Sequence, residues 1–263
     1  MHFIVQENIN KEDFKEFTDA IVNLGHTFES FYHKPFDNSY PEFDTRKPTF
    51  IYAASSVTDA IFDEYNGFVG VFNHTRGINI HNFYKTRADL MWSPRAYQGT
   101  LASVLTDIKP NDQLIFARPA IDDKLFAGQV STQEELIETC KRMINADPSL
   151  ANHEVFLGGY KPPNYEYRLF IIAGEVVASS QYRVDGFVYP VEGSPKKVKD
   201  KANEFHHVHS DILPAAYVID IATNDDETDI GVIEINCIHN SGFYDIIKSN
   251  LISGIARFME TAL

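Results

Sequence analysis

Two short runs near the carboxyl end of the chain, YVIDIA and GVIEIN, each carry a carboxylate in the middle of an apolar, β-rich stretch. Side chains of a strand alternate between its two faces, so Glu234 and Asn236 project from the same side, together with Val232. If the two runs pair as a hairpin, Asp220 can lie on that face as well. An unpaired carboxylate is costly to bury, so the fold must give these oxygens a partner.

Two carboxylates and one amide oxygen form a set of hard ligands. Such a set suits Mg²⁺, which takes one or two protein carboxylates and fills its remaining positions with water and phosphate oxygens. We therefore interpret Asp220, Glu234 and Asn236 as metal ligands. The alternative is a solvated acidic strand, because charged side chains are mostly exposed.

Cationic residues occur at strand ends and within one strand. Arg118 ends a buried-looking strand, Lys124 lies in the loop that follows, Arg168 lies inside the apolar run EYRLFII, and Arg183 ends SSQYR. Guanidinium groups match phosphate oxygens in shape, and a lysine adds a mobile charge, so this group could surround a triphosphate. The alternative for each arginine is an ion pair with a nearby acid, for example Arg168 with Glu166.

Apolar periodicity and turn signals predict an α/β fold with an N-terminal lobe over residues 1–90 and a core over residues 91–263. In the lobe we expect strands at 3–5, 26–32, 49–53 and 67–72, and helices at 11–24, capped by Asn10, and at 56–65. In the core we expect strands at 113–118, 154–157, 165–173, 175–182, 216–222 and 231–237, and helices at 97–105, 132–145, 194–205 and 244–263.

Composition excludes several classes of protein. The 263 residues carry a net charge of −14, which argues against general binding to nucleic acid or to an anionic membrane. The two cysteines, Cys140 and Cys237, form no CxxC pair, so neither a disulfide framework nor a zinc ribbon is indicated. The chain has no apolar run of about 18 residues and no secretion signal at its start. We expect a cytoplasmic protein that does not span a membrane.

At this point the motifs resemble a known family. The order IFARPAIDDKLFAGQV, EVFLGG, EYRLFIIAGEVVASSQYR, YVIDIA and GVIEINCIHNSGFY is similar to the ATP-grasp superfamily, in particular to a clade of small phage and bacterial members. The resemblance covers about residues 112–250. It implies an ATP-grasp fold in which two lobes hold ATP, preceded by a small α/β lobe like the one that often precedes such a core.

The resemblance also implies site residues. Adenine would pack against the strand around Glu154, Phe156 and Leu157. Arg118 would stand where most members have a phosphate-binding lysine, and Lys124 would lie in or near the phosphate loop. The loop has a single glycine, Gly128, where several are common. The resemblance further implies Asp220, Glu234 and Asn236 as the magnesium ligands.

The activity implied is ATP- and Mg²⁺-dependent ligation of a carboxylate to an amine through an acyl phosphate, on small-molecule or peptide substrates. Arg168 would stabilise the transferring phosphoryl group, and Arg183 would hold phosphate or the acceptor carboxylate. Two alternatives stay open: a nucleotide-binding protein without ligase activity, such as a regulatory or partner-binding module, and an ATP-grasp kinase that stops after phosphoryl transfer.

Overall fold

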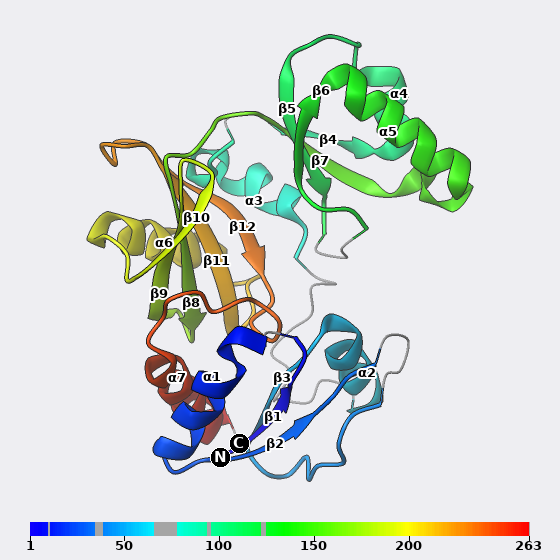
Figure 1. The fold of residues 1–263 in the computed structure, drawn as a ribbon. Helices are drawn as coiled ribbons and strands as arrows, with labels where there is room; N and C mark the ends of the chain where they lie inside the picture. Colours follow the sequence, from blue (N-terminus) through cyan, green and yellow to red (C-terminus); the bar gives the residue numbers. More distant parts are fainter. Residues whose placement is uncertain (10, 35–38, 66–77, 94–95, 122–124, 263) are drawn as a thin grey trace.

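The computed structural model describes residues 1–9, 11–34, 39–65, 78–93, 96–121 and 125–262, and its strands form three sheets in three parts of the molecule (Figure 1). The first sheet is parallel, with strand order β2-β1-β3. Its elements are β1 (His2–Gln6), α1 (Lys11–Asn23), β2 (Thr27–Phe31), β3 (Thr49–Tyr52) and α2 (Ser55–Tyr65). Alternating residues of β1 pack on both faces: Phe3 packs in one cluster with Phe17 of α1, and Ile4 in another with Ile61 of α2.

The second and smaller sheet is antiparallel, with strand order β4-β7-β5-β6. Its elements are β4 (Ala96–Thr100), α4 (Leu101–Asp107), β5 (Leu114–Pro119), β6 (Gln129–Thr132), α5 (Gln133–Ala146), a 3₁₀ helix (Pro148–Asn152) and β7 (Glu154–Gly159). Ile115 and Ala117 of β5 pack in the core with α4 and α5. Because strand side chains alternate, Phe116 and Arg118 face away from that helical layer.

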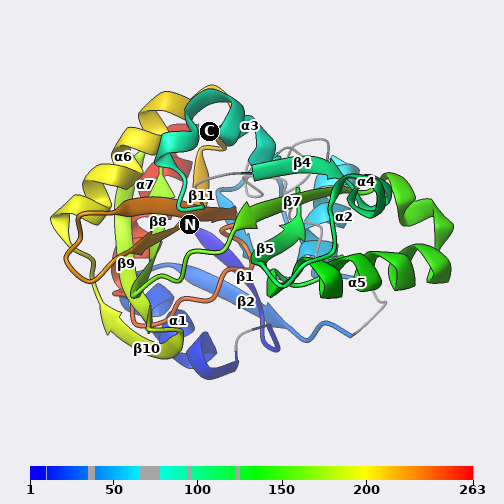
Figure 2. The ribbon, with the colours of Figure 1, turned by 90° about the horizontal axis from the view of Figure 1, so that it is seen from above.

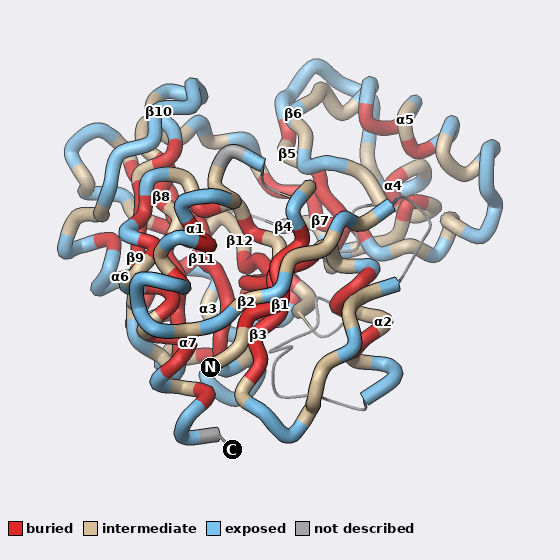
Figure 3. Tube along the Cα trace, turned by 60° about the horizontal axis from the view of Figure 1, so that its bottom comes forward, coloured by how far each residue is buried: buried red, intermediate tan, exposed pale blue. Residues whose placement is uncertain are grey.

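The third and larger sheet is antiparallel, with strand order β10-β9-β8-β11-β12. Its elements are β8 (Tyr165–Ile172), β9 (Glu175–Val184), β10 (Phe187–Glu192), α6 (Lys196–His209), β11 (Ala216–Thr223), β12 (Ile230–Asn236) and α7 (Lys248–Ala262). The central strand β11 is buried throughout, whereas the edge strand β10 is exposed throughout (Figure 3). The large sheet therefore has one protected edge and one open edge.

Helices and the first sheet cover the two faces of the large sheet. One face packs on α6 and on α3 (Ile80–Arg87), which lie side by side where Phe83 meets Phe205 with ring centroids 4.9 Å apart (Figure 2). The other face shares a core with α7 and with the first sheet, in which Phe170 of β8 and Phe3 of β1 belong to one cluster. Lys248 of α7 binds Asp13 and Glu16 of α1 and closes this contact.

Most of the predicted strands and helices occur, but the prediction of a helix over residues 97–105 is wrong in its first half. Ala96–Thr100 is strand β4, which pairs with β7, and the helix begins only at Leu101. Thr100 is the cap, because its hydroxyl accepts from the backbone N–H of Ser103 and the Ser103 hydroxyl accepts in return. The predicted final helix likewise begins at Lys248 rather than at residue 244.

Three elements have no counterpart in the prediction: α3, β6 and β10. Two predicted features, the strand over residues 67–72 and the cap at Asn10, lie outside the described residues. The domain boundary at residue 90 stays a prediction. Helix α3, which precedes that boundary in the sequence, packs against the large sheet.

Two buried histidines give the fold a predicted sensitivity to acid. Burial lowers the pKa of His81 and of His209, and for His209 the smaller effects of Asp211 and Arg87 oppose each other. Below about pH 6.5 the unfolded chain therefore binds more protons than the folded chain, so the free energy of unfolding falls as the pH falls. Each such group contributes at most about 1.4 kcal/mol per pH unit.

His209→Phe tests this expectation, because the ring lies between Phe83 and Phe205, where a phenyl ring is compatible. Urea unfolding at pH 8, 7, 6 and 5 should give a shallower loss of stability in the variant than in the wild type. Parallel curves for the two proteins would show that His209 stays protonated to the same extent in both states.

Candidate active site

Asp220, Glu234 and Asn236 meet on one face of the large sheet. Asp220 of β11 lies directly opposite Glu234 of β12, and the register shifts at the next pair, where Ile221 lies opposite Val232. Ile233 is thus the extra residue of a β-bulge. The side-chain amide of Asn236 donates to Asp220 Oδ2 at 3.2 Å and to Glu234 Oε1 at 3.0 Å.

The bulge corrects one detail of the sequence interpretation. Val232 does not share the face of Glu234; it packs in the same core cluster as Ile235, three residues later, and Ile219. Only an extra residue between them allows this spacing within a strand. The predicted grouping of the three polar residues is nevertheless found.

Arg168 of β8 binds Asp220 with two parallel hydrogen bonds. Nε donates to Oδ1 at 2.9 Å and Nη2 to Oδ2 at 2.7 Å, while Nη1 donates to the carbonyl of Gly242 at 3.3 Å. The guanidinium carbon also lies 5.1 Å from the ring centroid of Tyr244. The ion pair suggested from the sequence, with Glu166, is wrong for Arg168, and all of its nitrogens are engaged elsewhere.

Arg118 reaches the same cluster from the smaller sheet. Its Nη1 donates to Glu234 Oε2 at 2.5 Å, although the two residues belong to different sheets. Arg118 is only 8% exposed. One ion pair therefore joins the two sheets beside the acidic cluster.

The cluster shifts the ionisation of both carboxyl groups. Burial raises the pKa of Asp220 to about 6, against the opposing attraction of Arg168. Burial also disfavours the charged form of Glu234, but Arg118 and the Asn236 amide outweigh it, so the pKa of Glu234 is lowered. Both groups are ionised at pH 7, and the nearby arginines balance their charges.

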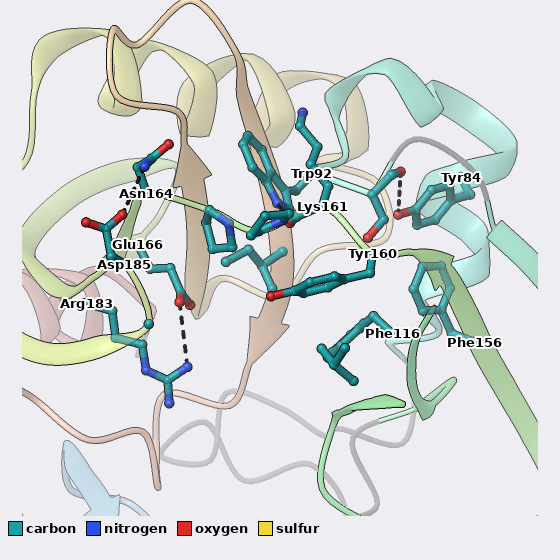
Figure 4. A pocket seen from close by; sticks show the side chains of 16 residues that line it. Tyr84, Trp92, Phe116, Phe156, Tyr160, Lys161, Asn164, Glu166, Arg183 and Asp185 are labelled. Atoms are coloured by element: carbon teal, nitrogen blue, oxygen red, sulfur yellow. Dashed lines mark hydrogen bonds and ion pairs between the residues drawn. The ribbon is translucent and has the colours of Figure 1, made fainter. Parts of the chain in front are cut away.

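A cavity of about 560 Å³ opens beside this cluster, between the two sheets (Figure 4). Aromatic residues gather at one end and polar residues at the other. The aromatic end is lined by Tyr84, Trp92, Phe116, Phe156 and Tyr160, and the polar end by Asn164, Glu166, Arg183 and Asp185. Ile233 lines the cavity as well, because the bulge turns it away from the core.

At the polar end, Glu166 is the centre of a small network. It accepts a hydrogen bond from the Tyr182 hydroxyl at 2.7 Å, and its other oxygen lies 3.6 Å from Arg183 Nη1. Glu166 is 7% exposed and Arg183 is more accessible. This pairing places one carboxylate and one mobile cation at the same end of the cavity.

A second cavity, of about 250 Å³, lies where Arg118, Glu234, Asn236 and Gly128 come together. A Cβ on Gly128 would meet the ring of Phe116 at 2.8 Å. Glycine is therefore required here by the packing of Phe116. Lys124, which precedes Gly128 in the same loop, lies outside the described residues.

Two predicted adenine contacts point elsewhere. Leu157 lies in the core of the smaller sheet, because it alternates with Phe156, whose side chain reaches the cavity. Glu154 is exposed at the far end of β7, where it accepts a hydrogen bond from Asn79 at 2.7 Å. Of the three residues proposed for this role, only Phe156 lines the larger cavity.

The chemistry of the acidic cluster fits a magnesium ion. Asp220 and Glu234 supply two carboxylates, and Asn236 can supply an amide oxygen, which leaves positions for phosphate and water oxygens. Among the residues that the structure describes, no group of three or more His, Cys, Asp or Glu side chains could hold a metal ion without such help.

The sequence interpretation missed Tyr84, Trp92, Tyr160, Glu166 and Ile233 as cavity residues. Glu166 could have been found, because it lies two residues before Arg168 and so shares its face of β8. Trp92 and Tyr84 come from a segment without a clear pattern. Ile233 depends on the bulge, which alternation alone does not reveal.

The comparison with family models agrees with this geometry. A model described as an ATP-grasp domain, family 3 of its clade, matches residues 68–255. The chain belongs to this ATP-grasp family. The family match spans both the smaller and the larger sheet, including every residue of the acidic cluster.

Solved ATP-grasp structures share the fold along the whole chain. The D-cycloserine synthetase DcsG is 14% identical, with a TM-score of 0.65, over 99% of this chain and 98% of that one. The ligase PsnB, solved with a precursor variant, Mg and ADP, is 12% identical, with a TM-score of 0.57, over 98% of both chains. The D-alanine–D-alanine ligase of Bacillus anthracis, solved with ATP, is 12% identical, with a TM-score of 0.58, over 100% and 98%.

None of the curated proteins matches the chain. Across the described segments of the ATP-grasp chain, no helix has both the length and the apolar character needed to cross a membrane.

Proposed function

We propose that the protein is an ATP- and Mg²⁺-dependent ligase that joins a carboxylate to an amine. The observation that carries this proposal is the acidic cluster of Asp220, Glu234 and Asn236, which lies beside a cavity with an aromatic end and faces Arg118 from the other sheet. Three structural neighbours are named as ligases or synthetases, and the titles of two of them include ATP, or Mg and ADP.

In the proposal, the nucleobase lies among Phe116, Phe156 and Tyr160, and Glu166 accepts hydrogen bonds from ribose hydroxyls. Arg118 and Arg183 hold phosphate oxygens. Mg²⁺, held by Asp220, Glu234 and Asn236, would neutralise charge on the phosphates. Arg168 holds Asp220 in place and lies near enough to contribute positive charge to the transferring group.

The reaction proposed has two steps. A carboxylate oxygen of the substrate attacks the γ-phosphorus of ATP, and ADP leaves, which gives an acyl phosphate. The amine nitrogen then attacks the acyl carbon, inorganic phosphate leaves, and the amine gives up a proton. The cluster of cations supports both steps, because negative charge accumulates first on the transferring phosphoryl group and then on the leaving phosphate.

Nucleotide binding is the first test. Trp92 is the only tryptophan of the chain and lines the cavity, so its fluorescence should change when a non-hydrolysable ATP analogue binds in the presence of Mg²⁺. Calorimetry gives the affinity with and without the metal. Carboxylates and amines are then screened for ADP release and for an amide product by mass spectrometry. ADP without an amide would indicate a kinase, and no nucleotide binding would refute the proposal.

Tyr160→Ala should weaken nucleotide binding about tenfold, because the ring would lose its stacking contact with the base. Its side chain is 41% exposed, so the free energy of unfolding should hardly change. Tyr32→Ala is the matched control, since Tyr32 is 61% exposed and does not line the cavity. Equal affinities of the two variants would place the base elsewhere.

A further inference from the structure

Every charge of the acidic cluster already has a partner of opposite sign. Asp220 is paired with Arg168 and Glu234 with Arg118. The two carboxylates and the two guanidinium groups together carry no net charge. A bare divalent cation added to this largely buried group would leave an excess of two positive charges, which is unfavourable where the effective dielectric constant is low.

The two arginines are not held equally. Arg168 uses three nitrogens, two on Asp220 and one on the carbonyl of Gly242, and it lies against the ring of Tyr244. Arg118 has a single hydrogen bond to Glu234 and lines the smaller cavity beside it. Arg118 is therefore the guanidinium that can exchange its partner at lower cost.

The donors also face the carboxylates in the ion-paired arrangement. Asn236 turns its NH₂ group, not its oxygen, toward Asp220 and Glu234. A metal ion would need the amide oxygen instead, so the amide must rotate by half a turn. The two carboxylates alone leave most positions of a six-coordinate ion unfilled.

We infer that Arg118 makes the cluster selective for a metal–polyphosphate complex over the free metal ion. Because the metal takes the place of Arg118 on Glu234, and the guanidinium moves to the phosphate oxygens, both charges are balanced only when metal and polyphosphate arrive together. This inference rests on the proposed nucleotide site and adds a role for Arg118: it excludes the bare cation.

Metal binding without nucleotide tests the inference. Mn²⁺, which prefers similar oxygen ligands and is detected by electron paramagnetic resonance, serves as the probe. Wild type should bind Mn²⁺ only weakly until tripolyphosphate or a non-hydrolysable ATP analogue is added. Arg118→Gln removes the charge and should bind Mn²⁺ alone at least about tenfold more tightly than wild type. Arg118→Lys keeps the charge and should behave like wild type.

The double variant Arg118→Gln with Glu234→Gln should lose the gained affinity, which assigns the ion to this cluster. Equal Mn²⁺ affinity of wild type and Arg118→Gln overturns the inference, and so does an Arg118→Lys variant that binds like Arg118→Gln. Circular dichroism checks the folding of each variant.

The wild-type protein gives an independent answer if a variant does not fold. Tight binding of Mn²⁺ alone, unchanged by polyphosphate, overturns the inference even when the ATP analogue binds normally. By contrast, absence of any binding of the ATP analogue, with or without metal, refutes the proposed function. The two failures are therefore distinguishable in the same titrations.

Discussion

Glu234→Gln is expected to abolish the advantage that Mg²⁺ gives to nucleotide binding. The substitution keeps the shape of the side chain but removes a charge that faces Asp220 and Arg118. The ratio of nucleotide affinities with and without Mg²⁺ should fall about 100-fold, or about 2.8 kcal/mol. The affinity without metal should stay the same or rise, because Arg118 is released for the phosphates.

Calorimetric titration with a non-hydrolysable ATP analogue, in Mg²⁺ and in EDTA, measures both affinities. Glu138→Gln is the matched control, because Glu138 is exposed on α5 and pairs with Lys141 three residues later. Such surface pairs contribute little, so the control should bind like wild type. An unchanged Mg²⁺ dependence in Glu234→Gln would exclude Glu234 as a metal ligand.

Gly231→Ala is expected to lower the free energy of unfolding by about 2–3 kcal/mol. A Cβ at this position would lie 2.6 Å from the backbone N and Cα of Trp92 and 2.8 Å from the carbonyl carbon of Met91. These are backbone atoms, so no side-chain rotation relieves the clash. The segment would have to move away from β12 and lose the hydrogen bond from Trp92 N to Val232 O.

The same displacement should reach the cavity. The indole N–H of Trp92 donates to the Lys161 carbonyl at 2.8 Å, in the connection between β7 and β8. We therefore expect Gly231→Ala to weaken nucleotide binding as well as stability, and to shift the fluorescence of Trp92. Urea unfolding and the analogue titration measure the two effects.

Gly25→Ala is the matched control for Gly231→Ala. Gly25 has a φ of +77° and no atom near the position of a Cβ, so its substitution introduces backbone strain without a clash. It should lower stability by about 1 kcal/mol and leave nucleotide binding unchanged. Equal stability losses in the two variants would mean that the backbone near Trp92 yields easily.

Sequence reasoning was most successful where one strand carried the information. Asp220, Glu234 and Asn236 follow from alternation and from the cost of burying carboxylates, and the structure brings them together. The ion pair between Arg118 and Glu234 spans 116 positions and two sheets, so no local pattern could reveal it. The position of Leu157 could have been predicted, because alternation with Phe156 excludes both from one cavity.

The β-bulge at Ile233 acts on β12 as an inserted letter acts on a reading frame. Before it, Val232 is in phase with the core; after it, Glu234 and Asn236 are in phase with the cleft, and Ile235 returns to the core. The inserted residue itself faces the larger cavity. Three consecutive residues, from Val232 to Glu234, thus answer to three different requirements: packing, contact with the nucleotide pocket, and charge.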